Sequence, residues 1–212
     1  MEFTIKILGR GLLIFILALT TGNLLGQTSG KLIYRQSDFN NKIDSLRSAS
    51  RNLVLPAGDQ LEMATYLAVS HYPELAGHKI KIKYKRNVQY PITASWSFWN
   101  IFKFRKHHTY VLLLSQDAFV KRLNLNGKIG VIGHEMAHFA YYRKRSSLGM
   151  GWWGIKYSIS KKFRFQFEKD ADRATIDHGL GWQLLDISFY MNKAEVKAYM
   201  EQRGYLESVS DR

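Results

Sequence analysis

The stretch GKIGVIGHEMAHFAYYRK, residues 127–144, decides the fold that this 212-residue chain is expected to adopt. Its apolar residues recur with helical spacing, at Ile129, Ile132, Met136, Phe139 and Ala140. A run of this period predicts a helix from about Asn126 to Lys144 that buries one face against other elements. Small residues in the same stretch would let those elements approach closely, namely Gly130, Gly133 and Ala137.

The letters HEMAH, residues 134–138, place two histidines and a glutamate within little more than one turn of that helix. Residues four apart lie on one helix face, so His134 and His138 can offer imidazole nitrogens to one metal ion. Glu135 lies beside that line, where it can take a proton from a metal-activated water as a general base. The alternative is a pair of histidines on a core helix without a metal, because a chance match occurs in roughly one chain in a hundred of this length.

A third metal ligand must come from elsewhere, and the segment FEKDADRA, residues 167–174, is the best candidate. Glu168 and Asp172 are four apart and therefore share a helix face. One of them can bind the metal while the other orients a ligating histidine through its second ring nitrogen. The alternative is an exposed acidic turn that pairs with Lys169 and Arg173.

Together, HEMAH and the downstream FEKDADRATIDHG resemble the motifs of the gluzincin peptidases. The resemblance is greatest to the family of CAAX prenyl proteases and HtpX heat-shock proteases. It implies one Zn²⁺ per chain, held by His134, His138 and Glu168, with Glu135 as the general base. It also implies that Asp172 hydrogen-bonds to a ligand histidine, and His134 is the expected partner.

The resemblance covers roughly residues 109–190, and it carries further expectations. In zincins the substrate is held as an added strand along a sheet edge above the metal, and here 91–99 or 109–115 would be that edge. A donor to the oxyanion is also needed, and four candidates are kept open: His178, Tyr141, Tyr142 and Tyr190. Integral-membrane members carry several hydrophobic spans that this chain lacks, so processing of prenylated proteins does not carry over.

The remaining pattern predicts an α+β fold with a small antiparallel or mixed sheet packed on the HExxH helix and the Glu-bearing helix. Residues 79–86 alternate lysine with apolar residues, which predicts a strand with one buried and one lysine face. The other predicted strands are 91–99 and 109–115, joined by an exposed connection at 103–108. The other predicted helices are 56–70 (capped by Asp59), 163–178 (ended by Gly179 as a left-handed cap), 181–191 and 193–203 (started by a capping box of Asn192 and Glu195). Residues 36–52 are a weak helix or a loop.

The first 26 residues are expected to be an export signal, because a positive start precedes the apolar run LLIFILAL. They are either cleaved as a signal peptide or kept as an anchor, and residues 27–212 form a single zincin-like domain. The chain has no cysteine, which excludes disulfides. Because of the export signal, we expect a periplasmic or secreted protein, with membrane association as a further option.

The net charge of +14 favours anionic partners such as a membrane surface, although a merely solubilising charge explains it equally well. Residues 145–160 are rich in Gly and Trp and have no clear period. Within them, segment 148–157 is a membrane contact, a lid or an ordinary covering loop. The leading hypothesis is an exported zinc metalloendopeptidase that acts on a peptide or protein. The alternative is a non-catalytic binding module of the cell envelope with a structural or vestigial metal site. Nucleic-acid binding is not expected.

Overall fold

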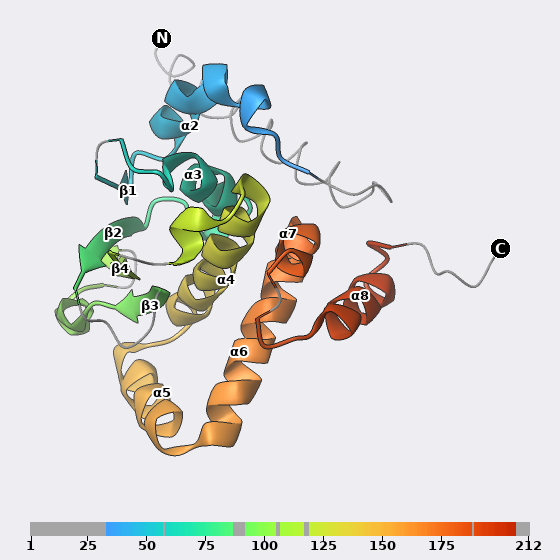
Figure 1. Ribbon diagram of the computed structural model, residues 1–212. Coiled ribbons are helices and arrows are strands. Elements are labelled where there is room, and N and C mark those ends of the chain that lie inside the picture. The colour runs from blue at the N-terminus through green and yellow to red at the C-terminus, as the bar shows by residue number, and fades with distance from the viewer. Residues whose placement is uncertain are drawn as a thin grey trace, which may run out of the picture.

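The computed structural model describes residues 33–56, 58–86, 92–104, 107–116, 119–187 and 189–206 (Figure 1). The expected export signal, residues 1–26, lies outside these ranges. Within them, the fold is α+β, and one helix lies between a small sheet and the remaining helices of the C-terminal half. No helix in the described part of the chain combines the length and the apolar character needed to cross a membrane.

The sheet is mixed and has four strands in the order β1-β2-β4-β3. The strands are β1 (Leu53–Val54), β2 (Lys79–Lys85), β3 (Ile92–Trp96) and β4 (Thr109–Ser115). Strand β2 pairs in parallel with β1 and β4, whereas β3 runs antiparallel to β4. The mixed sheet was therefore predicted, and β3 is the outer strand on the side of β4.

Strand β2 has the two faces that its alternating sequence predicts. Ile80 and Ile82 are buried in the core, while Lys79, Lys83 and Lys85 are exposed. The lysines do not protect a sheet edge, however, because β2 lies between two paired strands. The outer strands of the described sheet are β1 and β3.

The helices account for most of the second half of the chain. They are α2 (Ile43–Ala49), α3 (Glu62–Ser70), α4 (Leu125–Arg143), α5 (Ser147–Ile159), α6 (Lys161–Thr175), α7 (Gly181–Leu185) and α8 (Lys193–Gln202). Short 3-10 helices are η1 (Gln36–Asp38), η2 (Asn40–Lys42), η3 (Pro73–Leu75), η4 (Phe98–Phe102) and η6 (Phe119–Arg122), and η7 (Ile176–Leu180) is a π-helical turn. The segment 36–52 thus contains the short helices η1, η2 and α2.

Side-chain caps fix where the long helices begin. Asn124 accepts a hydrogen bond from Gly127 N at 2.7 Å and starts α4, and Ser160 accepts from Phe163 N at the start of α6. Asn192 and Glu195 form the predicted capping box of α8. The expected cap at Asp59 is wrong: its carboxylate accepts from Leu61 N within a turn, and α3 begins at Glu62.

Helix α4 packs closely because two of its glycines leave no room for a side chain. A Cβ atom at Gly130 would lie 2.5 Å from the carbonyl oxygen of Gln183 in α7, and one at Gly133 would lie 2.5 Å from a methyl carbon of Leu180. These close approaches explain why a helix with a metal motif carries small residues. They also hold the end of α6 and α7 against α4.

Segment 145–160 corrects the sequence analysis, because it is a helix, α5, rather than an irregular loop. Gly151 and Gly154 lower its helix propensity, and its apolar residues point both inward and outward, so the sequence shows no single apolar stripe. Met150, Trp153 and Tyr157 face the core or its margin. Helix α5 connects α4 to α6 at one end of the molecule (Figure 1).

The end of the second motif also differs from expectation. Helix α6 starts at Lys161, two residues before the predicted start, and passes into a π-helical turn that ends near Gly179. Gly179 has φ +81°, the left-handed conformation that was predicted for this position. The helix predicted over 181–191 ends already at Leu185, because residues after it turn back toward Asp172.

Candidate metal centre

Helices α4 and α6 bring three potential metal ligands to one buried point. His134 and His138 project from α4 one turn apart, and Glu168 projects from the facing side of α6. The Nε2 atoms of both histidines lie 3.1 Å from Glu168 Oε2. All three side chains are buried, and their ligand atoms lie within 4.8 Å of one another, so this group can hold a metal ion.

The spacing of the three donor atoms suits a small tetrahedral cation. Two donors that each lie about 2.1 Å from a tetrahedral zinc ion are about 3.4 Å apart. The observed separations of 3.1 Å are slightly shorter, as expected where atoms contact each other directly. The oxygen of Glu168 therefore lies at a spacing from both imidazole nitrogens that fits a shared zinc ion.

The protonation pattern of His134 gives a second reason for a cation here. Its Nδ1 lies 2.7 Å from Asp172 Oδ1, and an ionised carboxylate can only accept, so Nδ1 carries the proton. A neutral His134 then turns the lone pair of Nε2 toward the oxygen of Glu168, and two acceptors face each other in a buried place. A positive charge between them, a proton or a metal ion, removes the conflict.

Buried charges change the acid–base properties of these groups. Burial lowers the pKa of His134, but its hydrogen bonds to Asp172 and Glu168 outweigh burial and raise the pKa to about 10. Burial raises the pKa of Glu168, yet hydrogen bonds from His134 and His138 hold it well below the ordinary value. The centre therefore keeps a carboxylate ionised although it is largely buried.

Asp172 supports the centre from behind. One of its oxygens contacts His134, as the family resemblance implies, and the other accepts hydrogen bonds from Tyr190 N at 3.0 Å and Met191 N at 2.7 Å. The carboxylate is completely buried. It thus fixes the orientation of one ligand and ties the segment after α7 to the same point.

Glu135 follows His134 on α4 and is buried beside the three ligands. Its Oε2 accepts a hydrogen bond of 2.6 Å from the backbone N–H of Ala94, in the middle of edge strand β3. Burial raises the pKa of this carboxyl. The contact links the expected general base to the sheet edge, and sequence reasoning missed it because a backbone donor leaves no trace in residue type.

Tyr157 is a further residue that the sequence did not reveal. Its hydroxyl donates a 2.8 Å hydrogen bond to Glu168 Oε1, the oxygen that does not face the histidines. Tyr157 belongs to α5, so this helix is part of the support of the centre. Only the helical form of the Gly- and Trp-rich segment could have suggested it, since Trp153 and Tyr157 are then on one face.

The four candidates for the oxyanion donor lie in different surroundings. His178 is engaged at both nitrogens, by Ala174 O and by Glu74, and Tyr141 lies under the guanidinium of Arg145. Tyr142 is buried among aromatic rings, and burial raises its pKa strongly. Tyr190 is 41% exposed, and its ring lies parallel to His134 with centroids 6.1 Å apart. Tyr190 alone combines solvent access with contact to a ligand.

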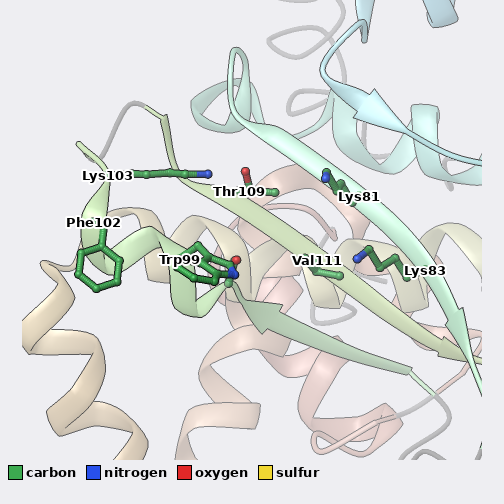
Figure 2. A pocket seen from close by; sticks show the side chains of 8 residues that line it. Lys81, Lys83, Trp99, Phe102, Lys103, Thr109 and Val111 are labelled. Atoms are coloured by element: carbon green, nitrogen blue, oxygen red, sulfur yellow. The ribbon is translucent and has the colours of Figure 1, made fainter.

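A hollow on the outer face of the sheet lies apart from this centre. Figure 2 shows Lys81 and Lys83 of β2 on one side of it and Trp99, Phe102 and Lys103 on the other. Because Ile80 and Ile82 point to the opposite, buried face, the lysine hollow and the metal ligands lie on different sides of the sheet. The hollow contributes nothing to the chemistry of the three ligands.

The chain matches no family model, no curated protein and no solved structure. Its function must therefore be argued from the geometry of the centre and from the sequence motifs.

Proposed function

We propose that this protein is an exported, zinc-dependent metalloendopeptidase of the gluzincin type. The observation that carries the proposal is the position of Glu135. It is buried next to His134 on α4, beside the three-ligand group, and accepts a hydrogen bond from the edge strand β3. A purely structural zinc site has no need of a buried carboxylate beside its ligands.

The proposed ligands are His134, His138 and Glu168, which leave a fourth coordination position for the reaction. Zinc bound there supplies Lewis acidity, which acidifies water and polarises a carbonyl group. Glu135 takes the proton of the attacking water and then delivers it to the leaving amine. Its burial suits both steps, because a carboxyl with a raised pKa holds the proton between them.

The substrate is proposed to bind as an added strand along β3. Of the two segments considered for this role, β4 is paired on both sides, whereas β3 has a partner strand on one side only among the described residues. Ala94 lies at the middle of β3 and contacts Glu135 directly. A peptide that pairs with β3 would therefore be extended where it passes Glu135, the proposed general base.

Tyr190 is proposed as the donor to the oxyanion. Its backbone N–H is fixed by Asp172, the carboxylate that also holds His134, so its side chain starts from a well-defined place beside the centre. The phenol is the most exposed of the four candidate side chains and can reach a bound substrate.

Tyr190→Phe is expected to lower kcat by roughly 100-fold, the usual effect of removing one oxyanion donor, with zinc content unchanged. Tyr199→Phe is the matched control, because the hydroxyl of Tyr199 contacts Asp177 on the surface. The steady-state rate of peptide hydrolysis is measured for the parent chain and for both variants. Equal rates for Tyr190→Phe and the parent chain would remove Tyr190 from this role.

The proposal as a whole is tested by hydrolysis of an unfolded protein with the zinc-loaded chain and its Glu135→Gln variant. Zinc binding without any hydrolysis would favour the alternative, a binding module with a structural metal.

A further inference from the structure

The outward face of α5 carries a stripe of exposed apolar side chains. They occupy consecutive turns of this 13-residue helix: Leu148 (89% exposed), Trp152 (61%), Ile155 (53%) and Ile159 (78%). Separations of four, three and four residues put them on one face. The opposite side of α5 is already occupied, since Trp153 packs on Phe167 and Tyr157 binds Glu168. The stripe is therefore left over after folding is complete.

The segment of chain that carries the stripe is basic. Between Glu135 and Glu168 the chain has no acidic residue and seven basic ones: Arg143, Lys144, Arg145, Lys156, Lys161, Lys162 and Arg164. Lys144, Lys156, Lys161 and Lys162 are exposed. The ammonium of Lys156 lies 5.6 Å from the centre of the Trp152 ring, so charge and apolar surface are directly adjacent.

We infer that α5 docks in the plane of an anionic lipid surface. An amphipathic helix with Trp, Leu and Ile on one side and lysines around it enters the interface between headgroups and acyl chains, and anionic lipids add to its affinity. The apolar stripe distinguishes a bilayer from a soluble polyanion, which would need only the charges. The charges disfavour a second copy of this chain, because two such surfaces would bring like charges together.

The position of α5 gives this contact a consequence for the metal centre. Tyr157 on the inner face of α5 hydrogen-bonds to Glu168, while Trp152 and Ile155 lie on the outer face. A docked α5 would hold the centre within about one helix diameter, some 10–12 Å, of the lipid headgroups. The inference does not depend on hydrolysis, and it remains testable in a chain that does not cleave peptides.

The test is flotation of the full chain with phosphatidylcholine vesicles that contain or lack phosphatidylglycerol. The parent chain is expected to partition more strongly onto the anionic vesicles. The double substitution Trp152→Ser and Ile155→Ser should lower its partition coefficient by at least about tenfold, since each loses apolar area that the bilayer would bury. Zinc content serves as the check on folding, because both side chains are exposed.

Two double substitutions of lysine test whether the charges beside α5 contribute to vesicle binding. Lys161→Gln with Lys162→Gln should weaken binding to anionic vesicles by roughly tenfold or more, at about 1 kcal/mol per lysine near the surface. Lys81→Gln with Lys83→Gln removes the same charge from the sheet hollow and should leave binding nearly unchanged (Figure 2). Equal losses in the two pairs would mean diffuse attraction by the net charge and would overturn a specific docking face.

A second measurement excludes a contribution from residues 1–26, which all variants share. Brominated lipids quench tryptophans that enter a bilayer, so Trp152→Phe should remove most of the quenching while vesicle binding persists. Quenching that Trp152→Phe does not change would contradict the inference. So would self-association that the Trp152→Ser and Ile155→Ser pair abolishes without any effect on lipid binding, because the stripe would then be an interface between copies.

Discussion

Glu135→Gln is expected to leave zinc bound and to slow peptide hydrolysis by roughly 100- to 10,000-fold, the range of a general base. Glutamine keeps the size of the side chain and can still accept the hydrogen bond from Ala94 N, but it cannot take a proton from water. His134, His138 and Glu168 are unchanged, so the metal should stay. Hydrolysis of an unfolded protein, followed by mass spectrometry beside a zinc assay, measures both effects.

Glu201→Gln is the matched control for this substitution, since Glu201 is exposed on α8. It should retain the full rate. If Glu135→Gln also retained it, Glu135 would not be the base, and the contact between Glu135 and β3 would be only a feature of packing.

Glu168→Gln is expected to weaken zinc binding by more than the 10- to 100-fold that is typical for loss of a residue behind the ligands. The carboxylate supplies the charge toward which the Nε2 atoms of His134 and His138 converge. An amide oxygen is a weaker ligand for zinc than a carboxylate. A solvent molecule would therefore take the position that Glu168 leaves, and only the two histidines would hold the ion. Competition with a chromogenic chelator measures the affinity.

Asp170→Asn is the control for the zinc measurement, because Asp170 is exposed on the same helix and pairs with Arg173. It should bind zinc like the parent chain. An unaltered affinity in Glu168→Gln would move the third ligand to another residue, and far-ultraviolet circular dichroism would show whether both variants keep their helices.

The sequence predicts the parts of the fold that local pattern determines. The period of α4, the alternation in β2 and the capping box of α8 each follow from neighbouring residues, and the structure contains all three. The spacing of HEMAH and of Glu168 with Asp172 places side chains on helix faces before any tertiary contact is known. That spacing leaves Glu168 and Asp172 as alternatives for the third ligand, the family resemblance selects Glu168, and the structure groups Glu168 with His134 and His138.

Other features depend on tertiary contacts and leave weak signals in sequence. The choice between β3 and β4 as the edge rests on strand order, which no single strand encodes. The donor to Glu135 is a backbone N–H, and any residue in place of Ala94 could supply it. Helix α5 escaped prediction because it has three glycines and apolar residues on both faces, and the role of Tyr157 was hidden with it.

X-ray absorption at the zinc edge tests the central claim most directly, because it reports the ligands of the metal itself. The full chain loaded with one zinc ion should show two imidazole nitrogens at about 2.0–2.1 Å together with oxygen ligands at about 2.0–2.2 Å. One of those oxygens should be an exchangeable solvent molecule in the open position, and Glu168→Gln should change the oxygen shell. A closed shell of four protein ligands, or no zinc bound at neutral pH, would contradict the account.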